Sequence, residues 1–354
     1  MNRNTLLHLS LISGLGPAKL EGLIAQLDNN QLASLDSFSV NDFQRYGFTI
    51  DKAQVIVEGL KDARLLEQEL QLLERHNIRW FTLFDDQYPA LLKEIHLPPP
   101  IIYVQGSTDF SEQALAFVGS RATSSYGRKV VQTLVPDLVA QNWTMVSGGA
   151  YGIDTIAHQA ALDAGGKTVA VLGSGLLQKY PADNKKLFES IIANNGSIVS
   201  SFPLMMQPLP HNFPARNRII SGLSQGSVIV RAAQKSGALI TAHYALQQGR
   251  RVFAVPGLID DPLSAGCHDL LRKGALLVDS ANAIFEEFGQ KDQKTEQQPL
   301  VFADPLVVLC QQPKTVDELL ILTDLTENKL NDRLFELQLE GKLQQNFIGL
   351  WQSL

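Results

Sequence analysis

The sequence predicts an α/β protein whose central domain is a mostly parallel sheet covered by helices. Short apolar runs alternate with stretches of helix length between residues 100 and 288, as in repeated strand-helix-strand units. These runs are apolar at nearly every position, which is typical of strands buried on both faces of a sheet. With 354 residues, 45% hydrophobic and 19% charged, the chain is long enough to form two or three packed domains.

The first 82 residues are expected to form a small helical domain. Leu and Ile recur at spacings of three and four in LLHLSLISGLG, LEGLIAQL and ARLLEQELQLLERH, with glycines or Asn/Asp clusters between these stretches. The segment ISGLGPAKL at Ile12–Leu20 is similar to the hairpin of a helix-hairpin-helix, in which backbone N–H groups and Lys19 would meet a phosphate. The net charge of −5 over residues 1–109 opposes such a contact.

The sheet domain is expected over residues 83–288, after the interruption by three prolines at Pro98–Pro100. Eight apolar runs predict its strands: IIYVQG, ALAFVGS, TMVSGG, TVAVLGSG, SIVSSF, SVIVRAA, RVFAVPG and ALLVD. Right-handed crossovers between parallel strands are expected. A mixed α+β domain is the alternative.

A polar linker and a further domain are predicted at the end of the chain. Residues 289–298, GQKDQKTEQQ, contain no large apolar side chain and predict the linker. Residues 299–354 then predict a helix near DPLVVLCQQ, a helix opened by a capping box from Thr315 to Glu318, a longer helix through ENKLNDRLFELQLEG, and a short strand pair. This order of elements is typical of a winged-helix domain.

Several classes of protein are excluded by composition and spacing. No stretch approaches the ~20 consecutive apolar residues that span a bilayer, and the N-terminus lacks the features of a signal peptide, so a cytoplasmic protein without membrane association is expected. Cys267 and Cys310 lie far apart without metal-ligand spacing, which predicts free thiols and no metal site.

The charge is distributed unevenly. Residues 110–290 carry +3, whereas residues 1–109 carry −5 and residues 291–354 carry −4. No Asp or Glu occurs between Glu189 and Asp260, and six basic residues fall inside this gap: Arg216, Arg218, Arg231, Lys235, Arg250 and Arg251. We interpret this segment as the footprint of a polyanion site.

Three predicted strands run directly into glycine-rich turns. These turns are Gly119-Ser120-Arg121, Ser147-Gly148-Gly149 and Gly173-Ser174-Gly175. In a parallel sheet they gather at the carboxyl ends of the strands, where free N–H groups and helix N-termini hold anionic oxygens.

The first turn, GSRATS, departs from GxGxxG, and the second strand ends without an acid, which argues against a dinucleotide site. GGKT at Gly165–Thr168 lacks the first glycine of a Walker A loop and leads into a strand, which argues against ATP hydrolysis.

The segment HNFPARNRIISGLS is the densest candidate site. It places Phe213, Arg216, Asn217 and Arg218 together at a predicted helix start. Arginines pair bidentately with phosphates, and an exposed aromatic ring offers a surface on which a base stacks. The structural alternatives are a core aromatic for Phe213 and ion pairing for the arginines.

Asp154 and His158 are the best candidates for an acid-base couple. They lie four residues apart on the helix that follows SGGAYGID, so both face the same side. A structural role is favoured, because an Asp in the first helical turn is stabilised by the helix dipole.

At these residues the sequence resembles a known family. GSRATSSYG, SGGAYGIDTIAHQAAL, GGKTVAVLGSGL, YPADN, FPARNRII, SGALITAHYAL and GRRVFAVPG occur in this order and closely resemble the DprA/Smf family of DNA-processing proteins. The resemblance covers most of residues 85–285. It implies an extended Rossmann-like domain that binds single-stranded DNA, forms homodimers and loads the recombinase RecA on incoming strands during natural transformation, with no cofactor and no enzymatic activity. It also implies that the N-terminal helices are SAM-like or a helix-hairpin-helix, and that the tail is a winged helix.

The resemblance assigns roles to particular residues. Arg121 would grip a phosphate, while Phe213, Arg216 and Arg218 would line the DNA pocket, with Phe213 stacking on a base. The chain departs from the family's acids at Ser201 and Arg231, and the second departure makes the strand ends more basic. We expect Arg231→Glu to weaken DNA binding less than Arg121→Ala.

Three further hypotheses concern the tail and the alternative functions. The presumed recognition helix of the tail mixes Lys329 and Arg333 with four acids, which penalises docking on DNA and favours a protein-facing role. The alternative function is a nucleoside-monophosphate phosphoribohydrolase on a similar sheet, although its PGGxGTxxE signature is absent. A purely structural partner-binding protein is the third possibility.

Overall fold

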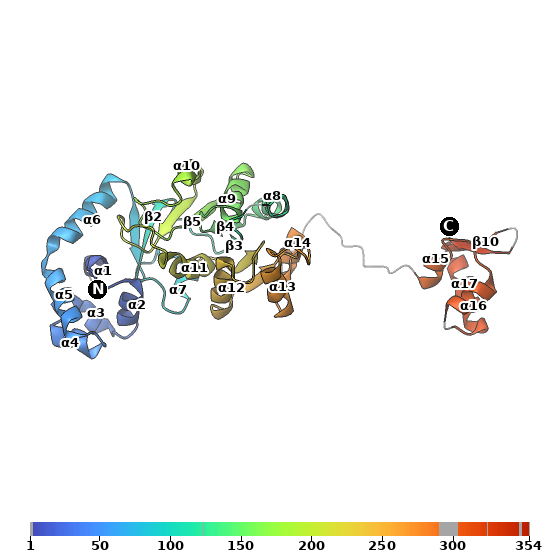
Figure 1. Cartoon of the computed structure of the whole chain (residues 1–354), viewed down its shortest axis with the longest axis horizontal. Coiled ribbons are helices and arrows are strands. Elements are labelled where there is room, and N and C mark those ends of the chain that lie inside the picture. The colour runs from blue at the N-terminus through green and yellow to red at the C-terminus, as the bar shows by residue number, and fades with distance from the viewer. Residues whose placement is uncertain (1–2, 123, 290–303, 324, 347–348, 354) are drawn as a thin grey trace. The chain divides into compact units, whose positions relative to one another are not determined.

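The computed structural model describes residues 3–122, 124–289, 304–323, 325–346 and 349–353. The chain divides into two compact units, residues 1–290 and 291–354, which are coloured blue to orange and red in Figure 1. Beyond Gly289, the predicted linker lies outside the described residues.

The first unit opens with helices, as predicted. Amphipathic sequence and N-terminal capping define them, since Asp28 and Ser39 each form a capping box and Asp62 accepts from the Arg64 N–H. The elements are α1 (Arg3–Leu11), α2 (Pro17–Ile24), α3 (Asn29–Ala33), η1 (Leu35–Ser37), α4 (Val40–Arg45), α5 (Ile50–Lys61) and α6 (Ala63–Arg75).

A nine-stranded sheet follows. Its strands are β1 (Arg79–Thr82), β2 (Ile101–Gly106), β3 (Ala114–Val118), β4 (Thr144–Ser147), β5 (Thr168–Val171), β6 (Ser197–Ser200), β7 (Gly226–Ile229), β8 (Arg251–Ala254) and β9 (Leu276–Leu277). The order is β1-β2-β6-β5-β4-β3-β7-β8-β9. The seven strands β6-β5-β4-β3-β7-β8-β9 are each parallel to their neighbours in this run. The pairs β1–β2 and β2–β6 are antiparallel. The predicted α/β class is therefore confirmed, and all eight predicted strands form.

The sequence prediction missed β1. We expected residues 1–82 to be helical, but Arg79–Thr82 form an edge strand that pairs with β2. Its four residues are too few to show a period, and the residues that precede them continue the helical pattern. The pairing with β2 is long-range information that a local pattern does not carry.

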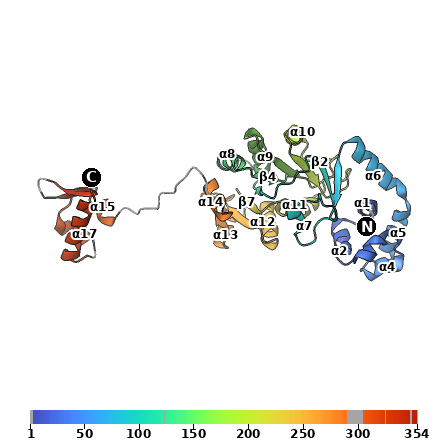
Figure 2. The same ribbon diagram turned by 180° about the vertical axis from the view of Figure 1, so that it is seen from behind.

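Helices cover both faces of the sheet, as the double burial of the strands requires. Along β3, Ala114, Ala116 and Val118 join one apolar cluster, whereas Leu115 and Phe117 join another. The first cluster includes residues of α11 and α12, and the second includes α8, α9 and α14; the two groups lie on opposite sides of the sheet in Figures 1 and 2. The helices are α7 (Ala90–Lys93), α8 (Ser125–Ala140), α9 (Ile153–Asp163), η2 (Ala182–Asn184), α10 (Lys185–Ala193), α11 (Asn212–Gly222), α12 (Gly237–Gln247), α13 (Ala265–Arg272) and α14 (Ala281–Glu287).

The N-terminal helices pack on the antiparallel side of the sheet. Tyr103 of β2 and Phe188 of α10 share a core cluster with the leucines of α1 and α2. The buried Glu69 of α6 accepts a hydrogen bond of 2.9 Å from the Leu204 N–H. One continuous core therefore joins the helical segment to the sheet.

The second unit is small and has its own core. It contains α15 (Pro305–Leu309), α16 (Val316–Leu322), α17 (Glu327–Leu339), β10 (Leu343–Gln345) and β11 (Trp351–Ser353), with β10 and β11 antiparallel. The capping box between Thr315 and Glu318 forms as predicted. Leu319, Leu334 and Trp351 pack together in the core. The assignment to the winged-helix class stays a prediction.

Both cysteines are free and buried, which confirms the prediction of free thiols. Among the described residues, no helix is both long and apolar enough to cross a membrane.

Candidate anion-binding site at the carboxyl ends of the strands

A cavity of about 620 Å³ opens where the central parallel strands end. Loops and helix starts that are far apart in the sequence meet there. Its walls come from the β3–α8 turn, the beginning of α9, helix α11 and the beginning of α12. Seven of the predicted site residues line it: Gly119, Ser120, Arg121, Phe213, Arg216, Asn217 and Lys235.

Arg121 and Phe213 form the accessible centre of this cavity. Arg121 is exposed, and its guanidinium carbon lies 5.8 Å from the centroid of the Phe213 ring, within the range of a cation–π contact. Phe213 is only partly buried, so it is not the core aromatic of the structural alternative. The pair presents a cation beside a partly open ring face.

Two tyrosines that the sequence analysis did not select complete the aromatic surface. Tyr151 and Tyr180 are both exposed, and with Arg121 and Phe213 they line a smaller adjoining cavity. The Tyr180 ring centroid lies 5.8 Å from that of Phe213, and the Tyr151 hydroxyl donates to Asp183 at 2.8 Å. The available signal was an aromatic residue within five positions after a predicted glycine turn, in GGAYG and in the quoted YPADN.

Lys235 and Asn217 bound the opposite side. Lys235 is exposed at the beginning of α12, so its ammonium group is free to meet an anion. The Asn217 side chain donates to the Gly237 carbonyl at 3.3 Å, which ties α11 to the start of α12. Cations thus stand on both sides of the aromatic surface.

Arg216 lines the cavity but is almost entirely buried in its wall. The residue is 4% exposed, and its Nη1 donates to the carbonyl of Gly148 at 2.5 Å and to that of Val171. Burial lowers the pKa of Arg216 to about 10, which leaves it a cation at neutral pH. Arg216 thus supports the ends of β4 and β5, and its direct contact with DNA stays a prediction.

Asp154 balances this buried cation. Its Oδ2 accepts from the N–H groups of Gly148, at 3.1 Å, and Ala150, at 3.3 Å. Burial raises the pKa of Asp154 to about 6, while the charge of Arg216 opposes the rise. These two N–H groups are occupied, so this turn does not offer them to an external anion as the glycine pattern predicted.

Close packing explains two of the predicted glycines. A Cβ on Gly148 would lie 2.7 Å from the Arg216 guanidinium and the Asp154 carboxylate, and one on Gly173 would lie 2.9 Å from the Phe213 ring. Ser147 is fully buried and donates to the Phe117 carbonyl at 2.6 Å. Ser147, Gly149 and Gly173 do not line the cavity, and they are better described as its support.

Arg218 points away from the cavity. It forms an ion pair with Glu21 of α2 and donates to the Leu97 carbonyl. Burial raises the pKa of Glu21 to about 7, against the opposing charge of Arg218. The predicted DNA contact at Arg218 is corrected to a contact between the N-terminal helices and the sheet.

Arg231 also lies outside this cavity. Its guanidinium pairs with Asp261 and lines a separate cavity. The prediction grouped Arg231 with the other arginines because no acid lies near it in the sequence. Its partner Asp261 lies just beyond the acid-free gap.

Asp154 and His158 do not form an acid-base couple. The fully buried His158 shares a hydrogen bond of 2.7 Å between its Nδ1 and the Thr168 hydroxyl, whereas Asp154 is bonded to the backbone. Burial lowers the pKa of His158 to about 3, so the imidazole is neutral at physiological pH. A structural role for both residues follows.

His158 is expected to make the protein less stable in acid. Its folded-state pKa lies below the value near 6.5 of the unfolded chain, so the unfolded state binds the proton and stability is lost as the pH falls from 6.5 toward 3. His158→Gln should remove this contribution, about 1.4 kcal/mol per pH unit in that range. The measurement is urea unfolding at pH 7 and pH 5 for both proteins, and parallel losses of unfolding free energy in the two would contradict the assignment.

Comparisons with known proteins place this geometry in context. A family model described as DNA recombination-mediator protein A matches residues 79–289. The chain is 46% identical over 256 residues to DNA processing protein DprA of Streptococcus pneumoniae, a match that covers 69% of this chain and 90% of that protein. It is 41% identical over 249 residues to protein Smf of Escherichia coli, covering 70% and 66% of the two chains.

Two solved structures are similar. The X-ray structure of Streptococcus pneumoniae DprA has a TM-score of 0.70 at 36% identity, covering 81% of this chain and 98% of that one. A structure of DNA processing protein A from Helicobacter pylori, which concerns the single-stranded DNA binding mode of that protein, has a TM-score of 0.53 at 29% identity. It covers 59% of this chain and 95% of the other.

Proposed function

Because this chain belongs to the DprA/Smf family of DNA-processing proteins, we propose that it binds single-stranded DNA in the cavity at the carboxyl ends of the strands. The observation that carries the proposal is the exposed Arg121 beside the partly open ring of Phe213. A guanidinium next to an aromatic surface supplies the phosphate contact and the stacking that an unpaired strand requires. The similarity to the Helicobacter pylori protein supports the same ligand.

Binding is proposed to be largely independent of sequence. The cavity offers Arg121 and Lys235 to the phosphate backbone and Phe213, Tyr151 and Tyr180 to the bases. Every base has a face that stacks on an aromatic ring, so such a surface does not select one base over another.

The cellular role is proposed from the family. We propose that the chain acts in the cytoplasm as a homodimer, protects incoming strands, and loads RecA on them during natural transformation or recombination. We also propose that it is not an enzyme. The buried His158 and the backbone-bonded Asp154 support this, because neither is placed to exchange a proton with a substrate.

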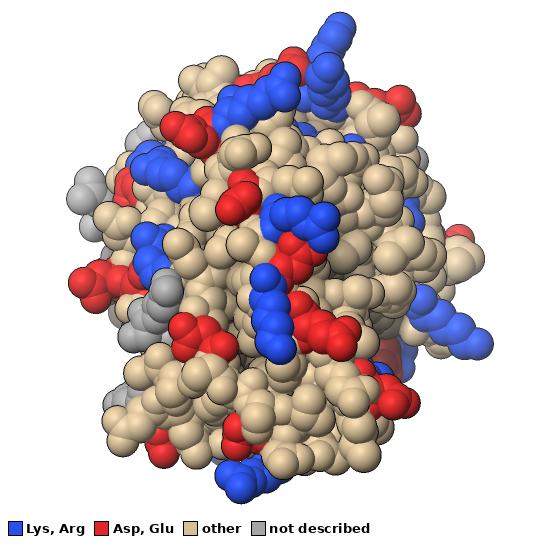
Figure 3. Space-filling model, turned by 90° about the vertical axis from the view of Figure 1, so that its left-hand side faces the viewer, with Lys and Arg blue, Asp and Glu red and all other residues tan. Residues whose placement is uncertain are grey.

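The N-terminal helices are not proposed as a second DNA site. The face that they present in Figure 3 carries basic and acidic side chains side by side. Lys19 donates to the Gly14 carbonyl at 3.2 Å, and proximity to Lys52 lowers the pKa of Lys19. A mixed surface of this kind gives little net attraction for a polyanion.

The proposed function is tested by fluorescence anisotropy of a labelled poly-dT oligonucleotide at several salt concentrations. We expect binding that prefers the single strand over a duplex competitor. The logarithm of the binding constant should fall against the logarithm of salt with a slope of roughly −0.7 per phosphate contacted. Absent binding, or binding that duplex displaces as well as single strand, would contradict the proposal. Release of free base from AMP would instead support the phosphoribohydrolase alternative.

A further inference from the structure

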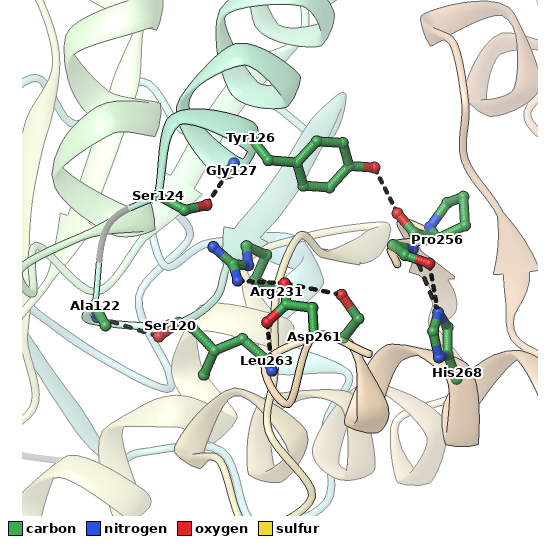
Figure 4. Close-up of polar contacts among 12 residues, drawn as sticks. Ser120, Ala122, Ser124, Tyr126, Gly127, Arg231, Pro256, Asp261, Leu263 and His268 are labelled. Atoms are coloured by element: carbon green, nitrogen blue, oxygen red, sulfur yellow. Dashed lines mark hydrogen bonds and ion pairs between the residues drawn. The ribbon is translucent and has the colours of Figure 1, made fainter. Parts of the chain in front are cut away.

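A second cavity of about 450 Å³ lies on the other side of the β3–α8 turn from the first. Its lining residues come from the start of α8, the end of β7 and the loop after β8, and six of them are Ser124, Tyr126, Arg231, Pro256, Leu258 and Asp261. Figure 4 shows Arg231 paired with Asp261 and, above them, Tyr126 reaching from α8 to Pro256.

Arg231 is the buried cation of this cavity. Its side chain is 7% exposed and pairs through Nη2 with Asp261. Its Nε and Nη1 have no hydrogen-bond partner among the residues that the structure describes. Buried guanidinium N–H groups without partners are costly, so this arginine keeps unused donor capacity in the wall of the cavity.

Helix α8 adds a second source of positive potential. The stem of Arg231 packs directly on its first turn, since a Cβ on Gly127 would lie 3.2 Å from the Arg231 Cδ. The N-cap Ser124 accepts from the Gly127 N–H at 3.0 Å, and the first turn of α8 contains no acidic residue. A 16-residue helix with an uncompensated N-terminus favours an anion at that end.

Asp261 offsets the charge of Arg231 but not the potential of the helix end. Its Oδ1 accepts from the Leu263 N–H at 3.0 Å, and its Oδ2 accepts from Arg231 and, at 3.3 Å, from the Ser264 hydroxyl. These donors hold the pKa of Asp261 below its usual value. The two charges thus compensate each other, and the helix end remains the uncompensated source of positive potential.

The remaining walls are apolar. Tyr126 is 42% exposed, and its hydroxyl donates to the Pro256 carbonyl at 2.5 Å, which fixes the ring over the cavity. Leu258, in the loop after β8, is 74% exposed. An anion next to an oriented ring and aliphatic side chains matches a nucleotide, whose phosphate is charged and whose base stacks.

We propose that this cavity binds one nucleotide unit, with its phosphate at Arg231 and the start of α8 and its base against Tyr126. The unit is either part of the bound strand or a free nucleotide. The strand is one source because Arg121 lines the first cavity and Ser124 the second, and the loop after β8 contributes Leu263 to the first and Asp261 to the second. If the nucleotide unit belongs to the bound strand, the inference rests on the proposed function.

The test compares two variants with two matched controls. Arg231→Gln removes the cation, and its control Arg218→Gln removes another buried, ion-paired arginine that lies outside both cavities. Tyr126→Ala removes the ring, and its control Phe84→Ala removes an aromatic ring of similar exposure from elsewhere on the surface. Because Tyr126 is exposed, that variant keeps the test valid if Arg231→Gln fails to fold.

Each protein is titrated with labelled poly-dT by anisotropy and with dTMP by calorimetry. We expect both variants to bind one of these ligands at least about fivefold more weakly than their controls, which is the loss typical of a missing base stack. Loss confined to poly-dT identifies the strand as the source, and loss confined to dTMP identifies the free nucleotide.

The outcomes for the two proposals are distinguishable. If wild type binds poly-dT and both variants match their controls with poly-dT and dTMP, the second cavity is not a nucleotide site and the proposed function stands. If wild type does not bind poly-dT, the proposed function fails, and the dTMP titration still decides the second cavity. Wild type that binds neither ligand overturns both.

Discussion

Arg121→Ala is expected to lower the affinity for single-stranded poly-dT by about tenfold to a hundredfold. A hydrogen bond to a charged group contributes roughly 1.5–3 kcal/mol, and Arg121 is the exposed cation that lies against the Phe213 ring. The change should also make the salt dependence shallower by roughly 0.7, which corresponds to one phosphate contact. Anisotropy titrations at three salt concentrations measure both quantities.

Two comparisons make this result specific. Arg75→Ala removes an exposed arginine at the end of α6, and it should change the affinity little because it lies on the helical segment. Arg231→Glu is expected to weaken binding less than Arg121→Ala, since Arg231 is buried and paired with Asp261. Unaltered affinity in Arg121→Ala would remove the first cavity as the DNA site, and an equal or greater loss in Arg231→Glu would move the centre of binding to the second cavity.

The architecture was predictable because its signals are local. Runs such as ALAFV and VIV are apolar at every position, and both contribute alternate residues to cores on opposite faces of the sheet. The element that the prediction missed, β1, owes its existence to pairing with β2 about twenty residues later. Local pattern is informative where burial dictates residue type, and it fails where a distant partner decides the structure.

The candidate site was predictable only in part, for the same reason. The acid-free segment between Glu189 and Asp260 correctly identified a basic region, yet all five of its arginines are balanced by acids from outside the segment. Arg218 pairs with Glu21, and the charge of Arg216 is balanced by Asp154. Separation along the chain does not measure distance in the fold, so only Arg121 and Lys235 remain as exposed cations of the predicted set.

Arg216→Met is expected to reduce the free energy of unfolding by about 3–5 kcal/mol, the cost of leaving a buried charge without the opposite charge that compensates it. The substitution leaves the Asp154 carboxylate buried without its cation and frees the carbonyls of Gly148 and Val171, to which Arg216 donates. These groups shape the ends of β4 and β5 beneath Phe213. The variant should therefore lose stability first and DNA affinity as a consequence. Urea unfolding monitored by circular dichroism measures the first effect.

A double variant separates the charge from the packing. Arg216→Met/Asp154→Asn removes both charges, so it should be more stable than Arg216→Met alone, although Asp154→Asn in the wild-type background removes an acceptor of two backbone N–H groups. The single variant should also regain stability relative to wild type as the pH falls, because Asp154, whose pKa is already raised to about 6, would be protonated more readily without Arg216. The double variant could instead lose the sum of the unfolding free energies that the two single variants lose, with no dependence on pH. That result would show that Arg216 stabilises the site through its volume and hydrogen bonds. Its charge would then not be required to keep Asp154 buried.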